Sequence, residues 1–217
     1  MKILDVNEFY AERGGGVRTY VHRKLEAAAT EGVQVVVVAP GERDGEEVRR
    51  GGKIVWVRSP KLVLDPRYHV LLRERAVHEV IRAESPDLIE GSSTWTAGWM
   101  AARYPRPIPR VLVFHQDPVA VYPQTLLDRF VAREAIDRRC EPYWRYLRRL
   151  ASRFDRTVVS GDWLAERLRV FDVPRPVAVP FGIDKERFRP ERRSAAKRAE
   201  LLLRCGLDAN GKLLVAV

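Results

Sequence analysis

The apolar residues of this chain follow two patterns that alternate along its length. Short, continuous apolar runs predict strands that are buried on both faces, and they occupy residues 2–6, 33–39, 54–58, 87–90, 111–114, 157–160 and 177–180. Between them, apolar residues recur at helical spacing, which predicts helices over residues 17–31, 66–84, 95–103, 124–139, 142–151 and 162–170. Residues 43–52 are polar and predict a loop or an irregular hairpin. Strands alternating with helices predict an α/β fold with a doubly wound parallel sheet.

A glycine-rich turn links the first strand to the first helix. Gly14, Gly15 and Gly16 stand at the start of that helix, where glycines let a ligand approach free backbone N–H groups at the positive end of the helix dipole. Such a site suits a phosphate or a sugar hydroxyl. Thr19 stands where a dinucleotide fingerprint needs its last glycine. The turn is therefore either a ligand site of another kind or only a tight connection. The helical pattern assigns a group of charged residues to the polar face of this helix: Arg18, Arg23, Lys24 and Glu26.

Small, polar and titratable residues follow several of the predicted strands. They occupy residues 14–16, 90–93, 115–118, 160–162 and 180–184. Parallel strands bring their carboxyl ends to one edge of a sheet, and ligands bind at that edge. We therefore expect Gly15, Gly91, His115 and Gly182 to line one groove.

His115 is the strongest candidate for a catalytic residue. It follows a buried strand, and a neutral imidazole there can bind a sugar hydroxyl or carry a proton; the alternative is a histidine that only caps the strand end. Glu90 can act as a base or pair with an arginine. The remaining histidines have no metal-ligand spacing, so no metal site is expected.

Hydroxyl residues at two other strand ends have two interpretations. Ser92 can bind substrate or, with its neighbours Ser93 and Thr94, cap the next helix. Ser160 can likewise bind substrate or cap a helix, as can Asp162. Gly91 can serve the site or only the turn.

The net charge of +10 comes almost entirely from arginine. Because arginine is spread over the whole chain, we attribute the charge to composition rather than to nucleic-acid binding. The first residues lack the apolar core of a signal peptide, and no apolar run is long enough to span a bilayer. Two cysteines without motif spacing are expected to be free thiols, which fits a cytoplasmic location.

An arginine stripe lies in the segment between the fifth and sixth predicted strands. Arg145, Arg149 and Arg153 recur at a spacing of one helical turn and alternate with aromatic residues. Such a stripe can lie on an anionic membrane surface at the inner face of the membrane, or it can be a solvated helix face.

Taken together, these motifs resemble the N-terminal half of a GT-B glycosyltransferase of the retaining family 4 type. The resemblance rests on residues 14–21, 87–91, 113–115, 157–160 and, above all, 179–184. The last segment is similar to the family's V-P-N-G-I-D, with Phe181 in place of the asparagine.

The resemblance implies a role for each part of the chain. Residues 1–184 would form the acceptor-binding domain, and residues 185–217 a linker, a helix around 194–205 and the first strand of a C-terminal donor-binding domain. His115 would contact the transferred sugar. The implied substrate-binding residues are Gly14, Gly15, Gly16, Arg18, Gly91, Ser92, Ser160 and Gly182.

The same resemblance implies a nucleotide-sugar as co-substrate, no further cofactor, and a glycan or lipid-linked acceptor. The family's paired glutamates and diphosphate-binding residues belong to the second domain. We therefore expect a truncated enzyme, inactive unless another chain supplies its C-terminal half. The alternative is a stand-alone module that binds a glycan or a lipid-linked sugar without turnover.

Overall fold

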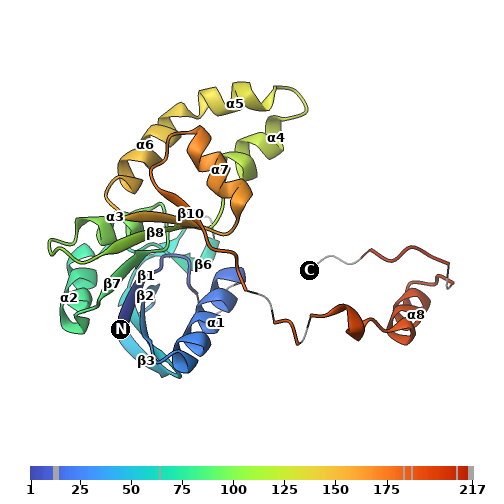
Figure 1. Ribbon diagram of the computed structural model, residues 1–217, viewed down its shortest axis with the longest axis horizontal. Helices are drawn as coiled ribbons and strands as arrows, with labels where there is room; N and C mark the ends of the chain where they lie inside the picture. Colours follow the sequence, from blue (N-terminus) through green and yellow to red (C-terminus); the bar gives the residue numbers. More distant parts are fainter. Residues whose placement is uncertain (12–14, 64, 183, 187, 209, 215–217) are drawn as a thin grey trace. The chain divides into compact units, whose positions relative to one another are not determined.

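An eight-stranded, mostly parallel sheet organises the computed structural model of this chain. Its strand order is β10-β9-β8-β7-β1-β2-β4-β3, and only β3 runs antiparallel. The predicted doubly wound α/β fold is confirmed. The structure describes residues 1–11, 15–63, 65–182, 184–186, 188–208 and 210–214 (Figure 1). The strands are β1 (Lys2–Val6), β2 (Gln34–Gly41), β3 (Gly45–Arg49), β4 (Gly52–Arg58), β5 (Lys61–Leu62), β6 (Asp65–His69), β7 (Leu88–Gly91), β8 (Arg110–Phe114), β9 (Arg156–Val159) and β10 (Pro176–Ala178).

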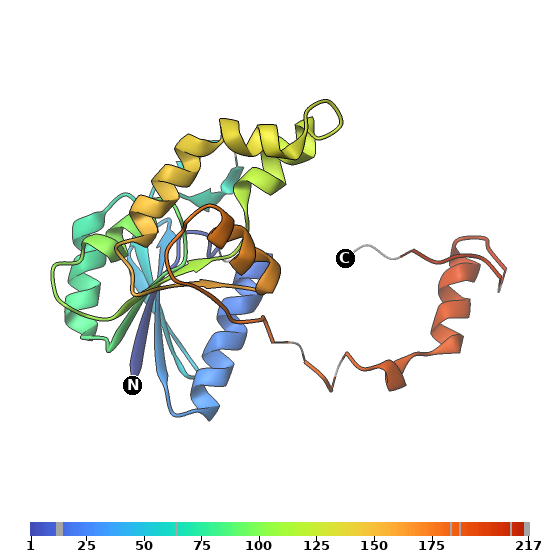
Figure 2. The same ribbon diagram turned by 45° about the horizontal axis from the view of Figure 1, so that its top comes forward.

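The helices cover the two faces of the sheet unequally. They are α1 (Gly16–Thr30), α2 (Glu74–Glu84), α3 (Thr96–Arg103), the π-helical turn η1 (Ala120–Gln124), α4 (Thr125–Leu127), α5 (Arg133–Arg139), α6 (Glu141–Ala151), α7 (Asp162–Val170), the 3-10 turn η2 (Pro190–Arg192) and α8 (Ala195–Arg204). Helices α2, α3, α6 and α7 share one apolar core with the sheet, whereas α1 packs with β2 and β4 in a second core. Figure 2 shows α1 and α2 on opposite faces.

All predicted central strands are present, but two predicted helices are wrong in extent. Residues 65–69 form β6, which pairs with β5 in a separate small sheet, so the helix predicted over 66–84 begins only at Glu74. Its apolar stripe, Val77 and Ile81, lies entirely in the later part. The helix predicted over 124–139 is interrupted between Leu127 and Arg133, where the exposed Phe130 provides no core contact. The polar segment 43–52 forms a hairpin in which β3 pairs with β4.

The chain divides into a first unit, Met1–Pro180, and a second unit, Phe181–Val217. In the second unit the helix expected around 194–205 is α8, and the Ser194 side chain caps it by accepting a hydrogen bond from the Lys197 backbone N–H. Residues 212–214 carry no regular secondary structure, and the rest of the strand expected there lies outside the described residues. In the described part of the chain, no helix is both long and apolar enough to span a bilayer. Cys140 and Cys205 are free thiols, as expected.

Candidate functional site

The site lies at the edge of the sheet where β1, β7 and β8 end. These strands are neighbours in the sheet and run parallel, so the segments that follow them meet at one edge. The chain reverses its direction of winding next to β1, because β2 lies on one side of it and β7 on the other. Such a topological switch point is where α/β sheets bind ligands.

The glycine turn leaves open space at the start of α1. A Cβ atom added at Gly15 or Gly16 would meet no atom within 4 Å, so packing does not require glycine at either position. Arg18 is half-buried in the first turn of the helix. Gly14 lies outside the described residues. The free N–H groups of this helix start are therefore accessible to a ligand.

His115 lies beside α1, one helical turn from its glycine start. Its ring and the Tyr20 ring are 5.6 Å apart between centroids in an edge-to-face arrangement. Burial lowers the pKa of His115, and Lys24 lowers it further while Asp5 opposes that effect. The imidazole is therefore neutral at neutral pH, so it can accept a proton and can both donate and accept a hydrogen bond.

A buried charge cluster lies near His115. Lys24, on α1, contacts Asp5 at 3.1 Å and also pairs with Glu90, and Asp5 and Glu90 are register partners on β1 and β7. Burial works against the charge of Lys24, but the two carboxylates outweigh it and raise the pKa of this lysine well above its usual range. Burial and the neighbouring Asp5 raise the pKa of Glu90. One cation thus serves two carboxylates.

Lys24 and Glu90 correct two expectations from the sequence. Lys24 was assigned to the polar face of its helix, yet its side chain is only 13% exposed because it turns toward the sheet. Glu90 does form an ion pair, but its partner is Lys24 rather than an arginine. Asp5, an acid inside the apolar run of β1, was the sequence signal for this cluster, because a buried carboxylate requires a cation or hydrogen-bond donors.

Gly91 and Ser92 end β7 on the side of the larger core. A Cβ atom at Gly91 would lie 3.1 Å from the Phe154 ring and 3.3 Å from the Ala101 Cβ, so close packing against Phe154 and α3 favours glycine here. The Ser92 backbone N–H donates to the Val6 carbonyl, and its buried hydroxyl has no partner among the described residues. A substrate role for either residue stays a prediction.

Glu8 and Ser93 support the start of α3. The Ser93 hydroxyl accepts a hydrogen bond from the Trp95 backbone N–H and donates one to Glu8, which also accepts one from Thr96. A carboxylate is favourable at this end of a helix. The N-cap of α3 is Trp95, without a side-chain cap, so the capping role expected of Ser92, Ser93 and Thr94 is wrong. Ser93 instead holds the turn that precedes the helix, together with Glu8, whose role the sequence pattern did not indicate.

The loop after His115 is anchored by a half-buried arginine. Arg167 on α7 contacts Asp117 at 2.6 Å and Asp137 at 2.7 Å, and its guanidinium lies over the Phe171 ring. Asp117 is itself buried and accepts the Val119 backbone N–H. These contacts fix the segment that follows β8 and so hold the main chain next to His115.

Ser160 and Gly182 lie farther along the chain. Ser160 is half-buried directly after β9. The helix that follows begins at Asp162 with Gly161 as its N-cap and without a side-chain cap, so the capping role expected of Ser160 and Asp162 is wrong. Gly182 belongs to the second unit.

Apart from the groups around His115, a pocket of about 690 Å³ opens beside α3 and α6. Its walls include exposed Trp95 and Tyr122, with Trp99 and Tyr146 joined by a 2.9 Å hydrogen bond. Aromatic faces and a few polar groups are typical of sites for small ligands. The pocket follows β7 and therefore adjoins the same edge of the sheet.

The arginine stripe is exposed, whereas its aromatic neighbour Trp144 is buried. Arg145 and Arg149 are exposed on α6, and Arg153 is exposed just after the helix. Trp144 is fully buried and stacks on Phe171 at 3.9 Å. The exposed stripe therefore offers positive charge to a membrane surface, but Trp144 is not available to insert into it.

Comparison with known proteins gives the family context of this geometry. The family model Glycosyltransferase Family 4 matches residues 14–187. The chain is 26% identical over 216 residues to a GDP-mannose-dependent alpha-(1-6)-phosphatidylinositol dimannoside mannosyltransferase of Mycobacterium tuberculosis, covering 95% of this chain and 54% of that protein. It is 27% identical over 201 residues to a GDP-mannose-dependent alpha-mannosyltransferase of Corynebacterium glutamicum, covering 91% of this chain and 47% of that protein.

The fold also resembles a solved structure. A sucrose-phosphate synthase from Thermosynechococcus elongatus superposes with a TM-score of 0.55 at 14% identity, covering 95% of this chain and 99% of that one. At this identity the likeness shows the fold alone. The chain spans about half the length of the curated relatives it matches.

Proposed function

Because this chain belongs to glycosyltransferase family 4, we propose that it provides the acceptor-binding half of a retaining glycosyltransferase. The half-enzyme would act on a glycan or lipid-linked acceptor, with a nucleotide-sugar as donor. The curated relatives are named for their dependence on GDP-mannose, which makes that nucleotide-sugar the first donor to test.

The observation that carries this proposal is the neighbourhood of His115. A neutral imidazole lies beside a helix start whose glycines leave room for a ligand, at the switch point of the sheet. In this arrangement, His115 would bind a hydroxyl of the transferred sugar. The N–H groups at Gly15 and Gly16 would approach the donor diphosphate or the acceptor. Gly91, Ser92, Ser160, Arg18 and Gly182 remain proposed substrate contacts.

Transfer by this polypeptide alone is not expected. Rate enhancement requires the activated donor to be fixed against the acceptor, and it requires charges placed in advance in a water-poor site to stabilise the departing nucleotide. A helix start open to solvent supplies only one wall of such a site. We therefore propose that a C-terminal half completes it.

The test fuses this chain to the C-terminal half of the Corynebacterium glutamicum relative. Transfer of radiolabelled mannose from GDP-mannose to a mannoside acceptor is expected for the fusion and not for the 217-residue chain. The same fusion carrying His115→Ala shows whether transfer depends on a residue of the N-terminal half. Robust transfer by the chain alone would refute the half-enzyme proposal. Binding of a mannoside by an inactive fusion would favour a stand-alone binding module instead.

A further inference from the structure

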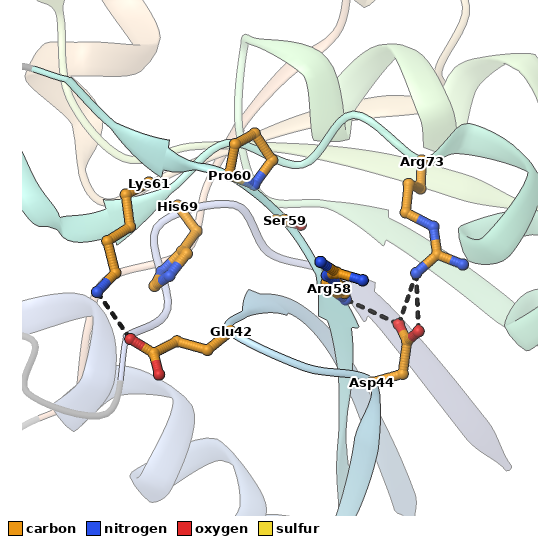
Figure 3. A pocket seen from close by; sticks show the side chains of 8 residues that line it. All are labelled: Glu42, Asp44, Arg58, Ser59, Pro60, Lys61, His69 and Arg73. Atoms are coloured by element: carbon orange, nitrogen blue, oxygen red, sulfur yellow. Dashed lines mark hydrogen bonds and ion pairs between the residues drawn. The ribbon is translucent and has the colours of Figure 1, made fainter.

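A basic pocket lies at the carboxyl ends of β2 and β4, away from His115. It has a volume of about 750 Å³. Figure 3 shows its charged side chains, which are Glu42, Asp44, Arg58, Lys61 and Arg73, together with the imidazole of His69. Strands β1, β2 and β4 are consecutive and parallel in the sheet, so this pocket opens at the same edge as the glycine turn.

The carboxylates of the pocket are already paired with cations. Lys61 Nζ lies 2.8 Å from Glu42, and Arg73 Nη1 lies 2.8 Å from both oxygens of Asp44. The hydrogen bond from Arg73 and a second from the Arg58 backbone N–H lower the pKa of Asp44, so this carboxylate is ionised at neutral pH. The side chains of these pairs are more than half exposed, and exposed pairs contribute little to stability. Their cations are therefore available to a ligand at small cost.

Two donors of the pocket are not used within the described residues. The Arg58 guanidinium makes no hydrogen bond or ion pair there, because only the backbone N–H of this residue bonds to Asp44. His69 Nε2 is buried without a hydrogen-bond partner among the described residues, and its ring lies beside the Lys61–Glu42 ion pair (Figure 3). The pocket thus holds one positive charge in excess and an imidazole that can donate a further hydrogen bond.

The hollow continues beyond Glu42, Asp44 and His69. An adjoining space of about 580 Å³ shares these residues and adds Trp56 and Arg43 to the wall. The N–H groups of an arginine guanidinium match the oxygens of a phosphate. Carboxylates accept hydrogen bonds from hydroxyls, and the face of an indole can cover the apolar side of a sugar or polyol ring. The three features are found in the walls of these two neighbouring pockets.

We propose that this pocket binds the phosphate group of a phosphorylated sugar or polyol, which forms part of the acceptor. Arg58, Lys61 and Arg73 bind the phosphate oxygens, and His69 Nε2 donates a further hydrogen bond to the ligand. Glu42 and Asp44 accept hydrogen bonds from ring hydroxyls. The role as an acceptor subsite rests on the proposed function, but the binding of the phosphate ester does not.

Calorimetry on the 217-residue chain tests the pocket without a donor or turnover. The probes are mannose 6-phosphate, mannose and inorganic phosphate. We expect mannose 6-phosphate to bind at least tenfold more tightly than either of the others. Arg58→Gln should weaken that binding at least tenfold, and because its guanidinium has no intramolecular partner the fold should be retained, as checked by circular dichroism. The matched control is Arg82→Gln, an exposed arginine at the end of α2.

The outcomes separate this proposal from the glycosyltransferase assignment. Equal binding of mannose and mannose 6-phosphate, or binding unchanged by Arg58→Gln, would refute phosphate binding in this pocket. Neither result would change the outcome expected of the fusion assay. Equal binding of inorganic phosphate would overturn the sugar part of the proposal.

Vesicles of phosphatidylinositol, with phosphatidylcholine as control, identify the source of the phosphate. Binding that requires Arg58 indicates a lipid headgroup, whereas binding of the soluble ester alone indicates a free phosphorylated sugar. If neither the ester nor the vesicles bind in an Arg58-dependent way, the proposal is wrong.

Discussion

Replacing Lys24 by methionine should destabilise the first unit strongly, because it removes the cation shared by two buried carboxylates. The Asp5 side chain is fully buried, and those of Glu90 and Lys24 are 12% and 13% exposed. At an effective dielectric constant of about 20, unit charges 3.1 Å apart attract by about 5 kcal/mol. Breaking a buried pair by removing one partner costs about 3–5 kcal/mol. For a domain of this size, that loss lowers the melting temperature by roughly 10 °C.

The loss should also depend on pH. Without Lys24, both carboxylates are buried beside each other without a cation, so their pKa values in the folded state rise above the unfolded values of about 4. Below the unfolded pKa these carboxyls are protonated in both states and cost no stability. As pH rises from the unfolded toward the folded pKa, only the unfolded state releases its protons readily, so the free energy of unfolding falls. The difference in unfolding free energy between Lys24→Met and the unaltered chain should therefore be larger at pH 8 than at pH 5.

Urea denaturation at both pH values measures this effect. Arg23→Met is the matched control, since Arg23 pairs with Glu26 on the exposed face of the same helix and its loss should cost less than about 0.5 kcal/mol at either pH. Lys24→Met combined with Glu90→Gln should regain part of the stability. If Lys24→Met is as stable as the unaltered chain at pH 8, the charge cluster does not act as described.

Further outcomes follow from the same edge of the sheet. In the two-domain fusion, His115→Ala should lower the transfer rate at least tenfold, roughly 1.4 kcal/mol, with little change in unfolding free energy; an unchanged rate, or a variant that fails to fold, would contradict its assigned role. Gly16→Ala should leave the chain as stable or up to about 1 kcal/mol more stable, because its added Cβ meets no atom within 4 Å, yet it should lower the transfer rate of the fusion. Equal transfer would indicate that the glycine serves only the turn. Sedimentation with anionic liposomes should fall when Arg145, Arg149 and Arg153 are changed to Gln and when salt is raised, since each basic side chain contributes about 1 kcal/mol near such a surface. Equal binding to neutral liposomes would argue against this mechanism.

The sequence alone determined the order of the central strands and of most helices along the chain, because continuous apolar runs and helical periodicity are local signals. It also indicated which strand ends carry polar residues, and it identified His115 and the glycine turn as candidates. The helix boundary at Glu74 was missed because the hairpin of β5 and β6 is held by pairing between strands rather than by an apolar period. The break between α4 and α5 was likewise invisible to a pattern that counts only residue types.

Only the tertiary structure decided which polar side chains meet. Lys24 and Glu90 are separated by 66 positions in the sequence, and their pairing depends on the register of β1 with β7 and on the rotation of α1 above them. The structure likewise identified the close packing at Gly91 and the unused donors of Arg58 and His69. Periodicity shows which residues avoid water, but a pairing between distant charges is fixed by the packing of whole elements, which a local pattern does not contain.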